Sequence, residues 1–328
     1  MDERSFREHI DRWESLALNG INEGGKVECE MDGRIKRIIF AGMGGSGIVG
    51  DFFLDLAHHY SFPFDIYSVK GDYIPFPVSS EDLVVLLSYS GDTMETLSIF
   101  NQVRETARVL AVTSGGMLLS LSMASPPACA IKLSKGLFPR LDLPEMLYAV
   151  SSFLSKNFGI RFLSRERLLS SLSAFRLDLR EEVLNAARSI FGYFPIFFAS
   201  RPYASVALRL KNDLSENSKI YSSIEIIPEA MHNTIESLWK LRNNHKIFFV
   251  AGRHAFGDIF VRAFSEVLGD RIDKVLLRGD DLISELIYGY RLSAYISLEL
   301  SSLSKVNPVK TEAIDRYKMS LKKILEEN

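Results

Sequence analysis

The stretch Ile39-Phe40-Ala41-Gly42-Met43-Gly44-Gly45-Ser46-Gly47 passes from an apolar strand into a glycine-rich turn. Residues 48–58 then have the composition of a helix. Glycine lets the backbone turn tightly and approach a ligand closely. Small hydroxyls and free amides at a helix start bind anions without a cationic side chain. The stretch therefore predicts a strand–loop–helix unit of an α/β fold, with an anion site in its loop.

A second loop of the same kind follows the apolar strand at residues 83–87 and reads Ser88-Tyr89-Ser90-Gly91-Asp92-Thr93. Two such loops on neighbouring strands of one sheet would converge on one phosphate group, so we expect a phosphorylated small molecule as the substrate. The alternative is plain helix capping, because Asp92 and Glu95 fit a capping box. Capping does not explain Ser88, Ser90 and Gly91 together.

Strand-like and helix-like runs alternate along the chain, which indicates parallel sheets covered by helices on both faces. The alternation restarts after a charged segment at residues 165–180. We therefore expect two doubly wound, flavodoxin-like α/β subdomains, residues 1–153 and residues 154–328, with an N-terminal helix at residues 6–19 and a C-terminal helical tail. The expected strands are residues 37–41, 64–69, 83–87, 109–113, 196–200, 224–227, 247–252 and 274–278, and a long helix is expected at residues 282–303.

Charge and composition exclude several classes of partner. The 39 basic and 41 acidic side chains give a net charge of -2, so neither nucleic acid nor an anionic membrane is an expected partner. The N-terminus lacks an apolar signal core, and the apolar stretch at residues 191–199 is too short to span a bilayer, so we expect a soluble, cytoplasmic protein. Cys29 and Cys129 stand alone in the sequence and are expected to be reduced, inert thiols. The 6 histidines are scattered, so no metal and no other cofactor is expected.

The spacing Gly42-x-Gly44-x-x-Gly47 also matches the dinucleotide fingerprint, which makes a nicotinamide-dependent oxidoreductase an alternative. That function requires an acidic residue at the end of the second strand, to bind the ribose. The second strand here ends in Lys70, and its acid, Asp65, is at its start. A dinucleotide site also has no use for the second serine-rich loop.

The chain resembles the sugar isomerase (SIS) fold over nearly its whole length and, more closely, the archaeal bifunctional phosphoglucose/phosphomannose isomerases. The first two loops are common to many SIS proteins, whereas the segments around Glu216 and His232 and the C-terminal segment are more specific. The segments that carry the resemblance are Gly42-Met43-Gly44-Gly45-Ser46-Gly47, Ser88-Tyr89-Ser90-Gly91-Asp92-Thr93, Thr113-Ser114-Gly115-Gly116, Pro139-Arg140, Lys211-Asn212-Asp213-Leu214-Ser215-Glu216-Asn217, Pro228-Glu229-Ala230-Met231-His232-Asn233 and Val306-Asn307-Pro308.

The resemblance implies an aldose–ketose isomerase that acts on hexose 6-phosphates through a cis-enediolate, in a homodimer whose active site takes its histidine from the partner chain. It implies that Arg140 stabilises the intermediate, that Glu216 is the base, and that His232 and Lys318 open the sugar ring. Thr311 would lie near C2 and leave space for both epimers. The residues implied to bind the phosphate are Gly45, Ser46, Ser88, Ser90 and Thr93. The chain departs from its relatives at Asp213, Ser215 and Met231, and it continues about ten residues beyond Lys318.

Each of these residues also has a purely structural interpretation. Glu216 could be a helix-surface acid that pairs with Lys219, and Arg140 a surface or capping arginine. His232 could be a partly buried histidine without a chemical role, and Thr311 the cap of the last helix. Two alternatives to an isomerase therefore remain at this stage, a SIS-type sugar-phosphate sensor without catalysis and the oxidoreductase.

Overall fold

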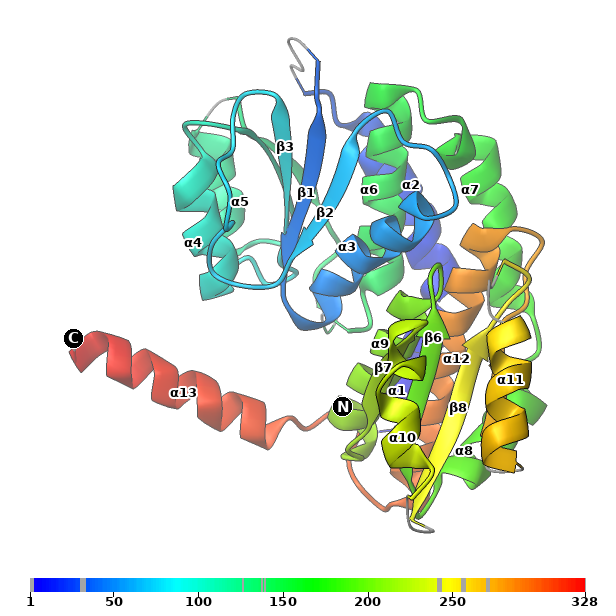
Figure 1. Cartoon of the computed structure of the whole chain (residues 1–328). Helices are drawn as coiled ribbons and strands as arrows, with labels where there is room; N and C mark the ends of the chain where they lie inside the picture. The colour runs from blue at the N-terminus through cyan, green and yellow to red at the C-terminus, as the bar shows by residue number, and fades with distance from the viewer. Residues whose placement is uncertain are drawn as a thin grey trace.

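The computed structural model describes residues 3–29, 34–125, 127–136, 138, 140–240, 244–254, 258–269 and 272–327. Two parallel sheets with helices around them form the body of the protein, which confirms the predicted α/β class (Figure 1). The first sheet has the strand order β2-β1-β3-β4-β5 and the second the order β7-β6-β8-β9. The strands are β1 (Arg37–Gly42), β2 (Asp65–Val69), β3 (Asp82–Leu87), β4 (Arg108–Thr113), β5 (Cys129–Lys132), β6 (Phe194–Ser200), β7 (Ser223–Ile227), β8 (His245–Ala251) and β9 (Ile272–Leu276).

Helices connect and cover the strands, as parallel pairing requires. The α-helices are α1 (Glu3–Asp11), α2 (Trp13–Lys26), α3 (Gly44–Ala57), α4 (Met94–Val103), α5 (Gly116–Ala124), α6 (Leu143–Phe158), α7 (Arg165–Ser171), α8 (Arg180–Ile190), α9 (Ala204–Asp213), α10 (Thr234–Leu238), α11 (Asp258–Leu268), α12 (Leu282–Leu303) and α13 (Glu312–Glu327). Single turns of other helix types are η1 (Arg161–Leu163), η2 (Leu172–Arg176), η3 (Leu214–Ser218) and η4 (Glu229–Met231).

The predicted N-terminal helix is in fact two helices, because α1 ends at Asp11 and α2 begins at Trp13. The apolar stripe that predicted a helix is nevertheless buried on both sides of this break, with Phe6 and Ile10 on α1 and Trp13 and Leu16 on α2. Apolar periodicity predicts which side chains are buried, and a buried stripe does not require one straight helix.

The first sheet brings the two serine-rich loops to one edge. Its strand β1 pairs in parallel with β3, and Gly42 lies opposite Leu87 at the carboxyl ends of the two strands. A side chain at position 42 would meet the carbonyl oxygen of Leu87 at 2.7 Å, so only glycine allows the strands to approach this closely. In Figure 1 these ends lie on the side of the sheet from which the chain enters α3.

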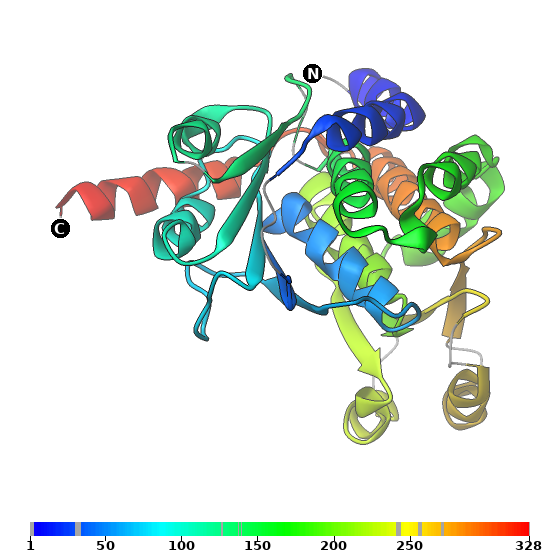
Figure 2. The ribbon, with the colours of Figure 1, turned by 90° about the horizontal axis from the view of Figure 1, so that it is seen from above.

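Helices rather than sheets join the two halves. The mostly buried helix α12 packs against α8 and α9, and the Phe52 ring of α3 contacts the Tyr290 ring of α12. The buried Asp55 carboxylate on α3 accepts hydrogen bonds from Arg201 Nη1 at 2.8 Å and from the Ser205 backbone amide at 2.7 Å. The boundary expected between residues 153 and 154 falls within helix α6. Figure 2 shows this arrangement from above, with α13 extending away from the rest of the chain.

The expectation of two free, reduced thiols is wrong, because Cys29 and Cys129 form a disulfide with a Cα–Cα distance of 6.0 Å. They are 100 residues apart in sequence, so their spacing gave no sign of this pairing. They meet because α2, which ends just before Cys29, packs near β5, where Cys129 is the first residue. An argument for a reducing compartment from unpaired cysteines therefore no longer holds. In the described part of the chain, no helix is both long and apolar enough to cross a bilayer.

Candidate active site

Hydrogen bonds join the two serine-rich loops to each other. Gly45 and Ser46 lie in the first turn of α3, and Ser46 Oγ accepts a hydrogen bond from the backbone amide of Tyr89 at 3.4 Å. Ser88 Oγ lies 2.9 Å from Thr93 Oγ1 and also accepts from the backbone amide of Gly91 at 3.1 Å. The structure thus brings the predicted phosphate-binding residues of both loops to the same edge of the sheet.

Ser90 and the starts of α3 and α4 remain available to a ligand. The Ser90 side chain is exposed, and its Oγ accepts from the backbone amide of Asp92 at 3.3 Å. Among the described residues, no side chain caps α3 or α4, and the first turn of α3 carries no acidic residue. Uncapped amides at a helix start and nearby hydroxyls are the groups that bind a phosphate in the absence of a cation.

Asp92 does not form the capping box that would have explained the second loop. Its Oδ1 accepts from the backbone amide of Met117 at 2.9 Å, so it binds the start of α5 rather than that of α4. The loop at residues 113–116 packs on the second loop, and Ser114 Oγ donates to the Tyr89 carbonyl at 2.8 Å. Gly91, at φ 76°, has no room for a side chain, because a Cβ would lie 1.9 Å from the carbonyl oxygen of Gly115. The serine-rich loop is therefore held from outside, and its own hydroxyls are not needed to cap α4.

Tyr89 connects the second loop to the segment that carries Arg140. Its hydroxyl donates to the carbonyl of Ser134 at 3.0 Å. Ser134 in turn donates through its Oγ to the buried Glu145 carboxylate at 2.9 Å. The chain between Ser134 and Glu145 includes Arg140, so the two serine-rich loops and Arg140 are part of one connected structure.

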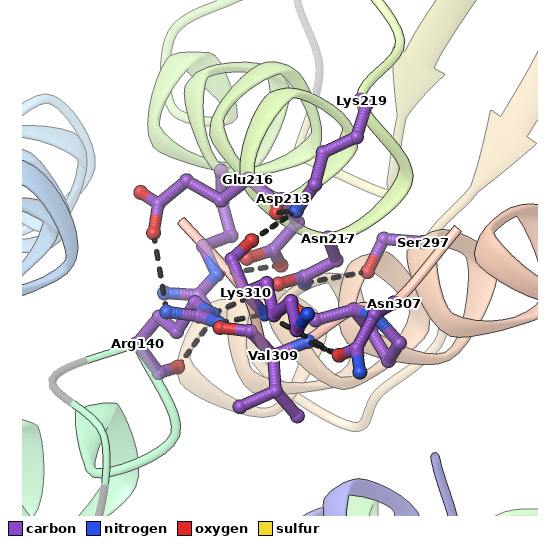
Figure 3. Close-up of polar contacts among 11 residues, drawn as sticks. Arg140, Asp213, Glu216, Asn217, Lys219, Ser297, Asn307, Val309 and Lys310 are labelled. Carbon is purple, nitrogen blue, oxygen red and sulfur yellow. Dashed lines mark hydrogen bonds and ion pairs between the residues drawn. The ribbon is translucent and has the colours of Figure 1, made fainter. Parts of the chain in front are cut away.

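Arg140 is buried and its guanidinium has partners on three sides (Figure 3). Its Nε donates to Asn217 Oδ1 at 2.8 Å, and its Nη2 donates to the carbonyls of Pro308 at 3.0 Å and Val309 at 3.1 Å. Its Nη1 lies 3.5 Å from Glu216 Oε2. With only 6% of its surface exposed, Arg140 is not the surface arginine of the alternative interpretation.

Glu216 is positioned by a change in helix type. The helix α9 continues into the single π-helical turn η3, and π-helical turns are frequent at functional sites. Burial raises the pKa of the Glu216 carboxyl, and the positive charge of Arg140 opposes this rise. Burial likewise lowers the pKa of Arg140, and the charge of Glu216 opposes that change. A quarter of the Glu216 side chain (25%) remains exposed, so the carboxylate can be reached by a ligand.

Lys219 does not pair with the Glu216 carboxylate, as the structural interpretation of Glu216 expected. Its Nζ donates instead to two backbone carbonyls, that of Glu216 and, at 2.6 Å, that of Lys310 (Figure 3). Lys219 adopts a left-handed backbone conformation with φ 60°, which is uncommon for a residue other than glycine or asparagine. The Glu216 carboxylate therefore faces Arg140 rather than Lys219.

Not all predicted residues belong to this cluster. Thr311 follows Lys310 directly, and its carbonyl accepts from the Asp315 amide at 3.0 Å at the start of α13. His232 lies in the turn after β7, an edge strand of the second sheet, and Lys318 is exposed on α13. Among the described residues, no hydrogen bond or ion pair connects the side chain of His232 or Lys318 to Arg140 or Glu216.

The sequence did not indicate two groups that surround Arg140 in the structure. Asn217 and the carbonyls at residues 308–310 orient Arg140 and Lys219, although both segments were noted only as motifs. The buried Arg209 donates to the Arg140 carbonyl at 2.6 Å and pairs with Asp213 at 2.8 Å. Within the described chain, no three histidine, cysteine, aspartate or glutamate side chains gather as a metal site.

Comparison with known proteins identifies the family. Residues 180–321 match the model of the bacterial phospho-glucose isomerase C-terminal SIS domain. The bifunctional phosphoglucose/phosphomannose isomerase of Aquifex aeolicus is 32% identical over 88% of this chain and 91% of its own length. That of Pyrobaculum aerophilum is 30% identical over 94% of this chain and 96% of its own length.

A solved structure supports the fold independently of sequence. The C-terminal domain of glucosamine-fructose-6-phosphate aminotransferase from Francisella tularensis superposes with a TM-score of 0.73 at 15% identity, over 93% of this chain and 98% of that domain. The chain belongs to the family of bifunctional phosphoglucose/phosphomannose isomerases.

Proposed function

We propose that this protein interconverts glucose 6-phosphate and mannose 6-phosphate with fructose 6-phosphate, by moving a proton between C1 and C2 through a cis-enediolate. The observation that carries this proposal is the approach of Arg140 Nη1 to Glu216 Oε2, at 3.5 Å. Aldose–ketose isomerisation needs a base beside a group that stabilises the developing oxyanion, and these two side chains supply both.

Glu216 is the proton carrier in this proposal. Its carboxylate removes the proton from C2 of the aldose, and the electron pair moves to the C1 carbonyl oxygen to form the enediolate. The same carboxyl then returns the proton to C1, while the proton of the O2 hydroxyl passes to O1, so that O2 becomes the carbonyl of the ketose and O1 its hydroxyl. A raised pKa favours this role, because the group must both accept and give up a proton near neutral pH.

Arg140 stabilises the negative charge that develops on the oxygens at C1 and C2. Its Nε and Nη2 already have acceptors, so Nη1 is the nitrogen that faces Glu216 and the reacting atoms. A fixed donor in a site that excludes water stabilises such charge more than a mobile one does, because it need not reorganise during the reaction.

The phosphate site and the proposed base come from different halves of the sequence, and Arg140 belongs to the first half. Gly45, Ser46, Ser88, Ser90 and Thr93 hold the phosphate from residues 1–153, which we propose as the N-terminal SIS domain. Residues 154–328, the proposed C-terminal SIS domain, supply Glu216 and His232 and the tail. Thr311 lies near C2 in this proposal, and its small side chain leaves space for either epimer.

We also propose a homodimer in which His232 and Lys318 complete the site for ring opening. Large apolar side chains are exposed on either side of the segment that carries His232, with Tyr221 before β7 at 74% and Trp239 after α10 at 60%. The helix α13, which carries Lys318, extends from the body (Figure 1). Its side chains Tyr317 and Ile324 are exposed. In the proposed homodimer, the partner chain covers these exposed apolar groups. We propose the cytoplasm as the compartment in which the protein acts on a sugar phosphate.

The test is to incubate the protein with fructose 6-phosphate in the presence of EDTA and to identify the products by NMR. We expect both glucose 6-phosphate and mannose 6-phosphate, and absence of both would contradict the proposal. Glu216→Gln should lower turnover by about 10³-fold or more while sugar-phosphate binding is retained, because the amide cannot accept the proton. A sensor without catalysis would instead bind fructose 6-phosphate and leave it unchanged.

A further inference from the structure

Residues 307–310 form a short strap that is held in shape by its own first side chain. Asn307 Oδ1 accepts hydrogen bonds from the backbone amides of Val309 at 2.8 Å and Lys310 at 3.3 Å. An asparagine that bonds to the backbone two residues ahead forms an Asx turn, and Pro308 restricts the backbone further by fixing φ. Asn307 itself is exposed, so its side chain does not contribute to the core.

The strap presents three consecutive carbonyl groups to two cations. The carbonyls of Pro308 and Val309 accept from Arg140 Nη2, at 3.0 and 3.1 Å, and that of Lys310 accepts from Lys219 Nζ at 2.6 Å (Figure 3). Arg140 is 168 residues away from Pro308 in sequence, so this contact closes the site across the fold.

A count of donors shows what the strap does to Arg140. The guanidinium has five N–H groups in one rigid plane. Asn217 takes the Nε donor and the strap takes the two donors of Nη2, which leaves the two donors of Nη1. Because the group is planar, fixing Nε and Nη2 also fixes the direction of Nη1, which lies 3.5 Å from Glu216 Oε2.

We infer that Asn307 is a positioning residue for the isomerisation, and that it acts by holding the carbonyls that orient Arg140. This inference rests on the proposed function, in which Nη1 stabilises the enediolate. Without the Asn307 side chain, the peptide groups at residues 308–310 can rotate, and Arg140 loses acceptors at fixed positions. The loss should affect the transition state more than the bound substrate, because the charge on the sugar oxygens develops only during the reaction.

Asn307→Ala, Asn307→Asp and Ser164→Ala provide the test and its controls. Aspartate keeps an oxygen that accepts from both amides, so Asn307→Asp should retain the turn. Ser164 caps α7, where its Oγ accepts from the Arg167 amide, and its loss should have no effect on catalysis. We expect Asn307→Ala to lower kcat by about tenfold with KM changed less than about threefold. The other two variants should stay within about threefold of the wild type in both constants.

A double variant separates positioning from a general loss of structure. In an Arg140→Lys background, Asn307→Ala should lower kcat by less than about twofold further, because residues that act through one group are not additive. The inference would be overturned if Asn307→Ala lowered kcat by the same factor in the wild-type and Arg140→Lys backgrounds. It would also be overturned if Asn307→Asp lowered kcat as much as Asn307→Ala does, or if Asn307→Ala changed only KM.

A readout without turnover separates this inference from the proposed function. Phenylglyoxal modifies accessible arginines, and the peptide that contains Arg140 can be followed by mass spectrometry. Arg140 should be modified several-fold faster in Asn307→Ala than in the wild type or in Asn307→Asp, and equal rates would overturn the inference. A wild-type protein that leaves fructose 6-phosphate unchanged would contradict the proposed function, whereas the modification rates would still report on Arg140.

Discussion

Arg140 Nη1 and Glu216 Oε2 lie 3.5 Å apart in a pair that is mostly buried, while the other nitrogens of Arg140 are bound by an amide oxygen and two backbone carbonyls. A guanidinium held in this way has a fixed charge at a fixed position. Its effect on the neighbouring carboxyl is therefore a property of the fold, and it leads to a pH-dependent prediction.

Arg140→Met should shift the acidic limb of the pH profile of kcat/KM to higher pH. Burial raises the pKa of Glu216, and Arg140 is the largest of the influences that lower it, so removal of the guanidinium raises this pKa further. Glu216 must be ionised to act as the base, and a higher pKa means that it ionises at higher pH. The limb is measured with fructose 6-phosphate across the acidic and neutral range. The control is Arg201→Met, because the Arg201 guanidinium pairs with Asp55 and not with Glu216. This variant should leave the acidic limb at the same pH. A shift to lower pH in Arg140→Met would contradict the assignment of the limb to Glu216.

Thr311→Gln should reduce activity on mannose 6-phosphate more than activity on glucose 6-phosphate. The two sugars differ at C2, and a longer side chain at residue 311 takes up the space that the proposed site leaves there. A steric change of this kind alters the ratio of the two kcat/KM values by about tenfold or more. Thr311→Ser, which adds no volume, serves as the control. Equal loss for both sugars in Thr311→Gln would exclude a role for Thr311 at C2.

Ser90→Ala should mainly weaken substrate binding. The exposed Ser90 hydroxyl belongs to the proposed phosphate site, and a phosphate is bound equally in the ground state and in the transition state. Loss of one hydrogen bond to a charged group costs about 1.5–3 kcal/mol, which corresponds to a rise in KM of about tenfold or more with little change in kcat. Steady-state kinetics with fructose 6-phosphate measures both constants. The control is Ser120→Ala, which removes an exposed hydroxyl on α5 that donates to the Gly116 carbonyl. A fall in kcat at constant KM would argue for a catalytic role of Ser90 instead.

Reduction of the Cys29–Cys129 disulfide should lower stability without lowering activity. The bond closes a loop of 100 residues, and disulfides typically stabilise the folded state by about 2–4 kcal/mol, mainly by restricting the unfolded chain. Denaturant unfolding with and without reductant measures the change. The double variant with serine at both positions should resemble the reduced wild type and show no response to reductant. A wild-type unfolding midpoint that reductant leaves unchanged would count against a stabilising bond.

Local patterns were enough to predict most of the elements and the edge of the sheet at which the two serine-rich loops meet. The helix α12 begins and ends at the expected residues, Leu282 and Leu303, because Asp281 caps its start and apolar residues continue over its whole length. The strand β3 is fully buried, and a continuous apolar run is typical of such a strand. In both cases the information lies within a few residues of the element itself.

The features that the sequence did not reveal depend on contacts between distant segments. No local pattern brings the carbonyls of Pro308 and Val309 to Arg140 or pairs Cys29 with Cys129. Backbone carbonyls carry no sequence signal at all, since every residue has one. The resemblance pointed to Arg140 and Glu216 as residues, but their geometry depends on how α9, η3 and the strap come together.

The position of the strap also has a consequence for the order in which the protein matures during synthesis. All nine strands in the described chain lie before residue 277, whereas the acceptors that orient Arg140 are at residues 308 and 309. A nascent chain released from the ribosome up to α12 therefore contains both sheets and the two serine-rich loops, yet Arg140 still lacks two of its acceptors. If Arg140 acts as we propose, competence for the reaction arises late in translation, after the framework of strands is complete.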